Sequence, residues 1–501
     1  MLGALVILGI HAVGYFFIWW FQGEHVGIPV LFGLLSTAML YGVGRMLVGW
    51  YTVLFISQPE WREPEPDRTT AIFITSTPGE PAEMFEATLA AAARIPTPHT
   101  TYLLDDTRDS EIARIADRHG AVRLELVGLP GAKAGKINAA LERTHEEFIL
   151  ILDPDHVPHP DFLERVLGHF RDPGIGFVQV SQAYGNSRSS FVARAAAEQT
   201  YAFYGPTLQG MYGLGTSVVI GANGTFRRTA LESIGGHGIG LAEDLITAIR
   251  LHAVGWRSVY VPEIVSYGRV PEDLGSFAKQ QLKWSRGVWE MLLVEYPRAF
   301  RRLTTLQKLS YLMIGTYYSF GLTTAIYLAV PLLYLSFGWL PASVGPAEFL
   351  QHAAPLGLFG VLIYIFSERF LCDRSRERGF HLRGFLLKLG LWPVYLRGAL
   401  LAFLRVDVPY IPTPKEARVG NFWRLSRIQL TTIAVTLALS ARMIRERLYS
   451  LPESQVRLTT GVAWGMLSFA LIHVTLASSV IYAAWRATRV KTRPGEGAKL
   501  S

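Results

Sequence analysis

The sequence predicts an α/β domain with a mostly parallel sheet, joined to an α-helical bundle of about six membrane spans. Half of the 501 residues are apolar, which is more than a soluble protein of this length needs. Long apolar stretches lie toward both ends of the chain, and short aliphatic runs alternate with helical patterns between them. We therefore expect two spans in residues 1–57, a cytoplasmic domain in residues 58–300, and interfacial and spanning helices in residues 301–501.

The charge and cysteine content narrow the class of protein. The net charge is +8, and Cys372 is the single cysteine. Basic residues crowd around the apolar stretches, which is typical of topology determinants and not of a nucleic-acid-binding domain. One cysteine excludes an intrachain disulfide and a cysteine-rich zinc site. The composition therefore predicts the lipid bilayer as a partner and no nucleic acid.

Six stretches are apolar and long enough to suggest membrane spans. The first, residues 1–22, lacks a basic leader and a small-residue cleavage site, so we expect a retained helix. The other spans are expected within residues 28–56, 318–340, 353–371, 428–443 and 459–485.

Lysine and arginine predict the orientation of these spans. They are absent from the candidate outside loops, residues 22–25 and 341–352, and abundant after the fourth and sixth spans. We expect an inner-membrane protein whose termini and soluble domain are cytoplasmic. Arg442, Arg445 and Arg447 disagree with this arrangement, because they fall in what would be the last outside loop.

The soluble region alternates between strand and helix patterns. Helical patterns at residues 82–94, 110–119 and 133–146 separate short aliphatic runs, which predicts right-handed crossovers and a parallel sheet covered on both faces. Ligands bind such sheets at the carboxyl ends of the strands. The strands are expected at residues 71–77, 100–106, 122–127, 148–153 and 175–181, so four aspartates lie at strand ends: Asp105, Asp106, Asp153 and Asp155.

The segment "DPD" suits a divalent cation. Pro154 favours an extended conformation for Asp153, in which positions two apart face the same way, so Asp155 can face the same ligand. Proteins usually hold Mg²⁺ with one or two carboxylates plus substrate phosphate oxygens. The alternative is a turn at a strand end, where aspartate and proline are common.

Two later segments carry further polar side chains in helical patterns. "AEDLITAIRLHAVGW" predicts a helix with Glu243 and Asp244 in its first turn, where acidic residues are also ordinary helix-terminus chemistry. "QQLKWSRGVW", residues 280–289, mixes amides, cations and two tryptophans next to the membrane region. Its alternative interpretation is an amphipathic interfacial helix.

In this order and at these spacings, the segments resemble the processive, membrane-embedded glycosyltransferases of family 2, above all the bacterial cellulose synthases. The resemblance implies a GT-A-type, Rossmann-like domain that uses Mg²⁺ or Mn²⁺ and a UDP-sugar. It implies that Asp153 and Asp155 hold the metal. The residues implied to bind the nucleotide sugar are Asp105, Asp106, Lys133, Lys136, Asp153, Gln280, Lys283, Thr413 and Lys415.

The same resemblance implies the catalytic and acceptor-binding residues. Asp244 matches the general base, with Glu243 beside it, and Trp284 and Asn223 match acceptor-side positions. "VPYIPTPKE" resembles a mobile gating loop at about residues 405–420. The chemistry of the reaction also requires a carboxylate base. An acceptor hydroxyl that displaces UDP must lose its proton, and the base that takes it lies on the face of the sugar opposite the leaving group. A single inversion of an α-linked donor predicts a β-linked product.

The resemblance implies polymerisation of a β-glucan-like chain, with UDP-glucose as the favoured donor. It also implies that the product is translocated through the helix bundle, and accessory export subunits are possible partners. UDP-N-acetylglucosamine, UDP-glucuronate and GDP-mannose remain open as donors.

Departures from the pattern include Ala242 in place of threonine and Lys283 in place of arginine. The short tail predicts no regulatory nucleotide-binding domain after the last span. The alternatives are a transferase of single sugars to a lipid carrier and, more distantly, a non-catalytic scaffold or transporter.

Overall fold

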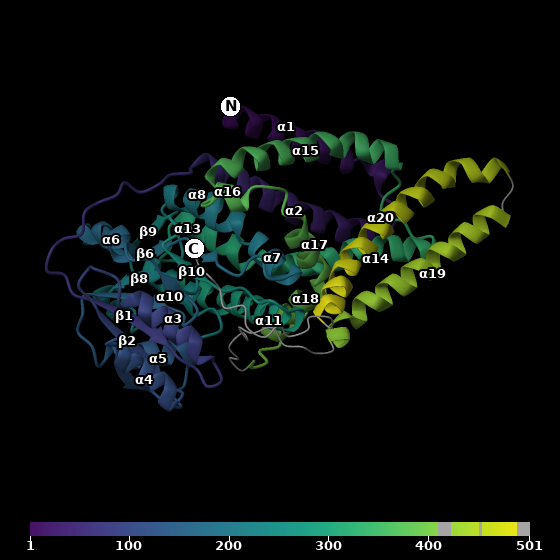
Figure 1. Ribbon diagram of the computed structural model, residues 1–501. Helices are drawn as coiled ribbons and strands as arrows, with labels where there is room; N and C mark the ends of the chain where they lie inside the picture. Colours follow the sequence, from purple (N-terminus) through teal and green to yellow (C-terminus); the bar gives the residue numbers. More distant parts are fainter. Residues whose placement is uncertain (409–421, 450–452, 488–501) are drawn as a thin grey trace.

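A seven-stranded mixed sheet lies at the centre of the soluble part (Figure 1). The computed structural model describes residues 1–408, 422–449 and 453–487. The strand order is β3-β2-β1-β4-β8-β6-β9. The strand bounds are β1 Thr70–Thr75, β2 Thr100–Asp105, β3 Val122–Glu125, β4 Phe148–Leu152, β6 Ile175–Val180, β8 Gly224–Arg227 and β9 Arg257–Val261.

The predicted mostly parallel sheet is confirmed, with one reversed strand. β1 pairs in parallel with β2 and β4, β2 with β3, and β6 with β9. Every residue of β1 and β4 is buried, as expected for strands covered on both faces. β8 lies antiparallel between β4 and β6, with Gly224 opposite Ile151. This pairing brings the residues just before β8 beside Asp153, which follows β4.

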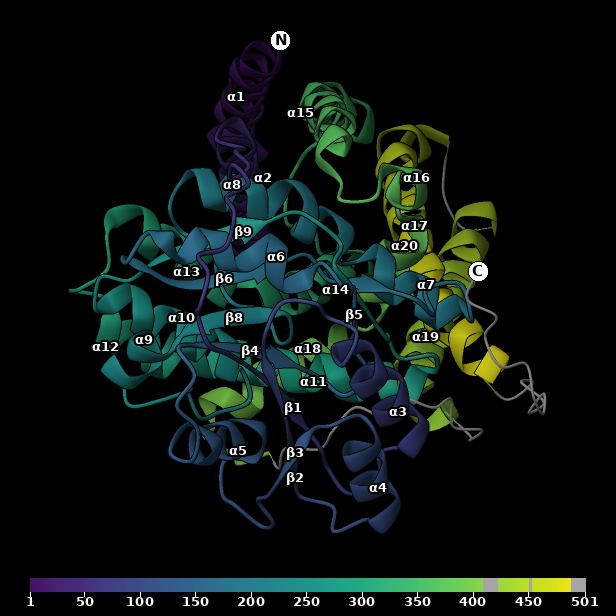
Figure 2. The ribbon, with the colours of Figure 1, turned by 60° about the vertical axis from the view of Figure 1, so that its left-hand side comes forward.

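Helices cover both faces of the sheet. Figure 2 shows α5 and the pair α3–α4 on opposite sides of β1 and β2. One face packs against Phe85 of α3, Ile112 of α4 and Phe162 of α6, and the other against Ile137 of α5 and Ile246 of α10. The bounds are α3 Ala82–Ala92, α4 Ser110–Arg118, α5 Ala132–Leu141, α6 Phe162–Leu167, α9 Arg228–Ser233 and α10 Glu243–Ala253. The third predicted helix ends five residues earlier than its pattern suggested.

A small three-stranded sheet follows the DPD segment. It consists of β5 (Val157–Pro158), β10 (Ser266–Gly268) and β7 (Ala183–Tyr184). Gly268 is needed at its centre, because a Cβ there would lie 2.4 Å from Nε2 of His156. The residue after β10, Arg269, donates its backbone N–H to Oδ2 of Asp155, so this sheet contacts the second aspartate of the motif.

Five helical segments are long and apolar enough to cross a membrane, among the described residues. They are 2–20 (α1), 29–54 (α2), 305–337 (α13 and α14), 346–370 (α15 and a 3₁₀ turn) and 461–486 (part of α20). The bent pair α17 (Leu382–Gly390) and α18 (Trp392–Phe403) adds a sixth if it counts as one span. Five of the six predicted spans are thereby confirmed as candidates.

The predicted fifth span, residues 428–443, is the exception. This segment lies in α19 (Arg427–Tyr449), which is helical but is not among the candidate spans of the described chain. Arg442 and the buried polar side chains Gln429 and Thr436 lower its apolar character. α19 nevertheless runs antiparallel beside α20 (Glu453–Ala487), so packing on an apolar neighbour, and not its own hydropathy, places this helix (Figure 1).

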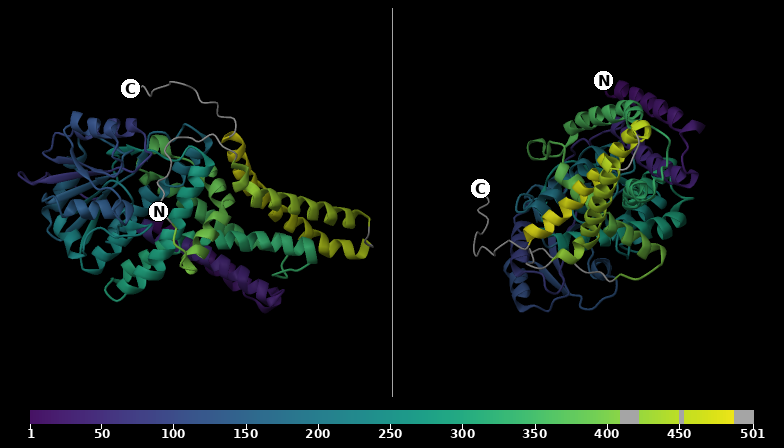
Figure 3. Two further views of the ribbon diagram at one scale, coloured as in Figure 1. Left: turned by 90° about the horizontal axis from the view of Figure 1, so that it is seen from below. Right: turned by 90° about the vertical axis from the view of Figure 1, so that its right-hand side faces the viewer.

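The membrane-proximal helices share a core with the soluble domain. Figure 3 shows the sheet at one end of the molecule and the α14, α19 and α20 bundle at the other. Buried residues from both parts, such as Ile249 of α10, Phe277 of α11 and Tyr395 of α18, belong to one cluster. The remaining helices are α7 Phe191–Glu198, α8 Leu208–Gly213, α11 Leu274–Glu290, α12 Tyr296–Ala299 and α16 Arg374–Glu377. Because the core is continuous, α11 holds a defined position against the sheet.

Candidate active site

The two adjacent aspartates at the end of β2 have different environments. The Asp105 carboxylate is fully buried and accepts hydrogen bonds from Ser76 Oγ (2.9 Å), Thr107 N (2.8 Å) and Arg123 Nε (2.6 Å). Burial opposes its ionisation, but these hydrogen bonds together hold the pKa of Asp105 below its ordinary value. Asp106 keeps part of its side chain exposed. Of the predicted pair, Asp106 is therefore the one placed to reach a ligand, and Asp105 shapes the loop.

The lysines of "KAGK" lie at the start of α5. Nζ of Lys136 donates to the carbonyl of Ser76 and lies 3.4 Å from Oδ2 of Asp106, and burial lowers the pKa of this lysine. Nζ of Lys133 lies 2.5 Å from Oδ1 of Asp153. The glycine between the lysines, Gly135, is sterically required, because a Cβ there would lie 1.9 Å from the carbonyl oxygen of Pro130.

Asp153 and Asp155 follow β4 as predicted and face a shared space. Their carboxylate oxygens and a ring nitrogen of His156 all lie within 4.8 Å of one another. The Asp155 side chain is buried and accepts from the backbone N–H of Arg269 at 3.2 Å. Two hard oxygen donors and an imidazole fit Mg²⁺ or Mn²⁺. Nδ1 of His156 lies 3.3 Å from Oδ1 of Asp155, whereas its Nε2 is buried against Gly268 and has no hydrogen-bond partner in the described structure.

His156 is the residue that the sequence reading missed. Its position directly after "DPD" was the available signal, but histidine after a turn is common and has no fixed role.

The first turn of α10 carries the predicted catalytic pair. Oδ2 of Asp244 accepts from Gly221 N at 2.6 Å, and Oδ1 accepts from its neighbour Leu245 N at 2.7 Å. These two backbone donors fix the orientation of the carboxylate. Burial raises the pKa of Asp244, against the opposing effect of these hydrogen bonds and of Lys133.

The neighbouring carboxyl, Glu243, also has a raised pKa. Burial raises the pKa of Glu243 to about 7, and the Asp244 charge adds to the increase, whereas Lys133 and Lys283 oppose it. Two carboxyls with raised pKa values at one point in a protein are a common feature of acid–base sites. The arrangement can therefore accept a proton from a substrate hydroxyl.

α11 brings the third predicted group of residues toward these carboxyls. Lys283 is close enough for its charge to act on both Glu243 and Asp244. Trp284, on the same helix, has a side chain that is 36% exposed and so offers an accessible flat face. Gln280 lies one turn earlier and is partly exposed. The whole segment, residues 280–289, is helical and lies within α11.

Gly287 allows α11 to approach the catalytic turn. A Cβ at this position would lie 2.8 Å from Ala242 N, which is backbone and cannot swing aside. We expect Gly287→Ala to destabilise the protein by about 1–3 kcal/mol, because overpacking against backbone forces the two helices apart. Thermal unfolding in detergent would measure this. Gly49→Ala is the matched control, since nothing lies within 4 Å of a Cβ there; equal effects of the two substitutions would contradict the explanation.

Asn223 and the gating-loop residues differ from the rest. Asn223 precedes β8 with a φ of 64°, and its side chain is completely buried, with no hydrogen-bond partner for either amide atom in the described structure. Contact with an acceptor would require this buried amide to become accessible. Thr413 and Lys415, predicted in the gating loop, lie outside the described residues.

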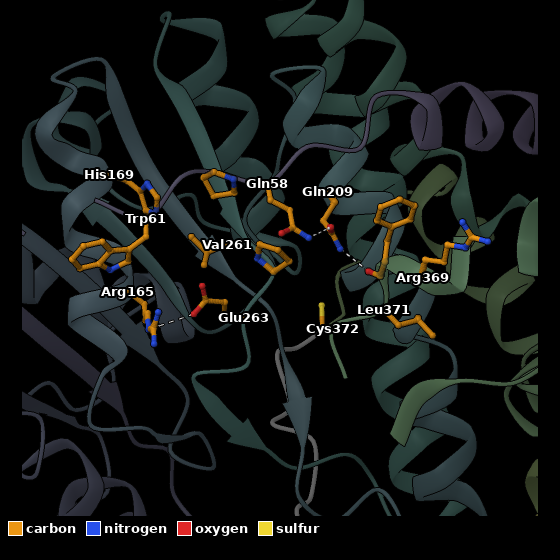
Figure 4. A pocket seen from close by; sticks show the side chains of 13 residues that line it. Gln58, Trp61, Arg165, His169, Gln209, Val261, Glu263, Arg369, Leu371 and Cys372 are labelled. Atoms are coloured by element: carbon orange, nitrogen blue, oxygen red, sulfur yellow. Dashed lines mark hydrogen bonds and ion pairs between the residues drawn. The ribbon is translucent and has the colours of Figure 1, made fainter. Parts of the chain in front are cut away.

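A cavity of about 170 Å³ lies elsewhere, between the segment after α2, helices α6 and α8, the end of β9 and the segment after α15 (Figure 4). Its polar groups are largely paired with one another: Gln58 Nε2 donates to Gln209 Oε1 at 2.9 Å, and Arg165 lies 3.4 Å from Glu263. None of the predicted site residues lines it. The cavity is therefore separate from the predicted nucleotide-sugar site.

Comparison with known proteins shows which proteins this chain resembles. A model described as glycosyl transferase family group 2 matches residues 148–365. The UDP-forming cellulose synthase catalytic subunit of Komagataeibacter sucrofermentans is 29% identical over 353 residues, which are 67% of this chain and 46% of that protein. The corresponding subunit of Pseudomonas fluorescens is 24% identical over 529 residues, 99% of this chain and 68% of that protein.

The fold is also that of solved transferases. A mannosyltransferase of Pyrobaculum calidifontis, solved with GDP-Man and Mn²⁺, superposes with a TM-score of 0.51 at 17% identity, over 75% of this chain and 100% of that one. Residues 148–365 thus match the family group 2 glycosyl transferase model, the chain shares the fold of the mannosyltransferase, and it is similar to bacterial cellulose synthase catalytic subunits. It spans less than half the length of the Komagataeibacter relative.

Proposed function

We propose that this chain is a membrane-embedded, inverting glycosyltransferase that polymerises a β-linked glucan from UDP-glucose and passes the product through its own helix bundle. The similarity to UDP-forming cellulose synthase catalytic subunits supports the donor and product class. The observation that carries the proposal is the position of Lys133. Its buried ammonium contacts Asp153 at 2.5 Å, and its charge also acts on Glu243 and Asp244. One cation thus connects the metal side of the site with the base side.

The donor side of the site neutralises negative charge. Asp153 and Asp155, with His156, are the residues that would hold a divalent cation, which when bound offsets the charge of the diphosphate leaving group. Lys133 and Lys283 add positive charge beside it. Asp106 is partly exposed and lies 3.4 Å from Nζ of Lys136, and we assign this pair to the nucleoside part of the donor.

The acceptor side removes a proton. Asp244, oriented by two backbone N–H groups, takes the proton of the acceptor hydroxyl as that oxygen attacks the anomeric carbon. One displacement inverts the configuration and forms a β-linkage from an α-linked donor. The exposed face of Trp284 suits the apolar face of the acceptor sugar ring. Thr413 and Lys415 are proposed to cover the bound nucleotide, as members of the gating loop.

The membrane arrangement belongs to the same proposal. Several apolar helices indicate an integral membrane protein. We assign residues 1–57 to two N-terminal spans, residues 58–300 to a cytoplasmic transferase domain and residues 301–501 to the remaining helices. Both termini are assigned to the cytoplasm, and accessory export subunits would meet the polymer on the other side of the membrane.

Transfer should decrease as the pH falls below about 7. Burial raises the pKa of both Glu243 and Asp244, to about 7 for Glu243, so acid protonates this pair and removes the base. The Lys133 charge acts on the pair, and the raised pKa of this lysine keeps it charged over this range. The initial rate at saturating donor, followed between about pH 8 and pH 5, measures the effect.

Glu243→Gln provides the control for this pH dependence. Removing the neighbouring negative charge lowers the pKa of Asp244. The acid limb of the variant should therefore move to lower pH. A wild-type rate that stays constant down to about pH 5 would contradict the assignment of the pair.

The donor is tested by nucleotide release. Purified protein with Mn²⁺ or Mg²⁺ would be given UDP-glucose, UDP-N-acetylglucosamine, UDP-glucuronate and GDP-mannose in parallel, and released UDP or GDP would be measured. The proposal expects release from UDP-glucose, with the others slower. Faster release from another donor would change the sugar but keep the transferase. If the protein binds UDP but releases no nucleotide from any of the donors, the proposal is wrong.

A further inference from the structure

The segment between α9 and α10, residues 234–242, contains glycines with unusual backbone angles. Gly235, Gly236 and Gly240 have φ values of 78°, 100° and 152°, which side chains rarely allow. A Cβ at Gly236 would lie 2.5 Å from Oδ1 of Asn138. The loop therefore passes this asparagine at a distance that only glycine permits. We call residues 234–242 the glycine loop.

Asn138 holds the middle of the glycine loop with both ends of its amide. Its Oδ1 accepts from His237 N at 2.6 Å, and its Nδ2 donates to His237 O at 3.0 Å. Asn138 lies on α5, the helix whose first turns carry Lys133 and Lys136. These two hydrogen bonds hold the backbone of His237 at its N–H and at its carbonyl, and so fix the peptide units on both sides of this residue.

The other side of the glycine loop is tied to α10. Gly238 N donates to Oγ1 of Thr247 at 2.8 Å, and this hydroxyl donates to the carbonyl of Glu243 at 2.6 Å. The loop then leads directly into Glu243 and Asp244. A continuous set of hydrogen bonds thus runs from the lysine helix, through the glycine loop, to the first turn of α10.

The imidazole of His237 does not compete with this connection. It is buried against the ring of Phe226, and burial together with the Lys133 charge lowers its pKa to about 3. The side chain is therefore neutral, and it adds no charge between the lysine and the carboxylates.

We propose that Asn138 is a positioning residue. By holding the glycine loop, it fixes the position of Asp244 relative to Lys133. The inference rests on the proposed function, since it matters only if the two groups act on one donor and one acceptor. The base, Asp244, and the cation beside the leaving diphosphate, Lys133, must then lie on opposite sides of the anomeric carbon of one sugar. A displacement of about 1 Å is enough to lower a rate about 100-fold.

Asn138→Leu removes both hydrogen bonds at similar volume. We expect its maximal rate to fall by about 30- to 100-fold, while the dissociation constant for UDP with Mn²⁺ changes by less than about threefold, because Lys133 and the metal residues are untouched. Asn138→Asp keeps the acceptor for His237 N but not the donor, so its rate should be intermediate. Equal loss of UDP binding and rate would overturn the positioning role.

A second substitution, just beyond the end of the same helix, separates positioning from stability. Oγ1 of Thr144, three residues after α5, accepts a hydrogen bond from Arg228 at 2.9 Å and donates to the carbonyl of Ala140 at 2.8 Å. Thr144→Val deletes these buried bonds without touching the glycine loop. We expect a lowered melting temperature with the rate within about twofold of wild type. If Thr144→Val reduces the rate as much as Asn138→Leu does, the effect is general destabilisation and the proposal fails.

Hydrogen exchange tests the connection without turnover. In the wild type, UDP with Mn²⁺ should slow amide exchange in peptides that contain His237 and Gly238, because ligand at Lys133 stabilises the loop through Asn138. In Asn138→Leu, basal exchange should be about tenfold faster, and UDP should no longer slow it. Wild-type protein that releases no nucleotide would refute the proposed function alone. Unchanged exchange in the variant would refute the role of Asn138.

Discussion

Asparagine in place of Asp244 should lower sugar transfer about a thousandfold and leave nucleotide binding intact. The side-chain amide has one acceptor oxygen, so it can keep the hydrogen bond from Gly221 N or the one from Leu245 N but not both. Lys133 and the metal-side residues are unchanged, so UDP should still bind. It cannot take a proton from the acceptor hydroxyl, and general base catalysis contributes about 10²- to 10⁴-fold to such reactions. UDP release at saturating UDP-glucose measures the rate, and titration with UDP and Mn²⁺ measures binding.

Glu243→Gln is the matched control for this result. It removes the other carboxyl of the pair and leaves Asp244 oriented by the same two N–H groups. We expect less than about a tenfold loss at pH 8, because the base is still present and its pKa is lower. If Glu243→Gln is the inactive variant and Asp244→Asn keeps more than a tenth of the rate, the two roles must be exchanged.

Removal of divalent cations should stop transfer. Asp153 and Asp155 converge with His156 on one small space, and the cations Lys133 and Lys283 alone cannot replace the charge of a metal on a diphosphate. Chelation with EDTA should lower UDP release at least about 100-fold, and added Mn²⁺ or Mg²⁺ should restore it. Activity that persists in EDTA, after extensive dialysis against it, would contradict the metal assignment.

Substitution of a metal-side carboxylate should weaken the response of the enzyme to added metal. Asp153→Asn should raise the Mn²⁺ concentration for half-maximal rate by about tenfold or more, because one of two carboxylate ligands loses its charge. Asp172→Asn serves as its control. Asp172 pairs with Arg257 at 2.6 Å, away from the predicted site residues, so its loss should not change the metal requirement.

The strands that position the site were predictable from local sequence. β1, β2 and β4 are runs of β-branched and aliphatic residues, and two of them lead into aspartates, so the carboxyl-end rule placed Asp106 and Asp153 near one ligand. β8 was not predictable. Its four residues, Gly224–Arg227, carry no pattern, and its antiparallel position depends on β4 and β6 on either side.

Side-chain environments were less predictable than strand ends. Neighbouring Asp105 and Asp106 look equivalent in sequence, yet Ser76 and Arg123, from two other segments, enclose only the first. The bond from Asn138 to the glycine loop joins residues 99 positions apart. Such contacts arise from tertiary packing, which the spacing of apolar residues along the sequence does not reveal.

Product analysis tests the central claim most directly. Purified protein with Mn²⁺ would be given UDP-glucose labelled in the sugar, and the labelled product would be separated by size and treated with a β-glucan-specific hydrolase. The account predicts label in a long polymer that the hydrolase degrades, absent from Asp244→Asn. Label confined to a lipid extract as single sugars, or a polymer that resists the hydrolase, would contradict a processive, inverting β-glucan synthase.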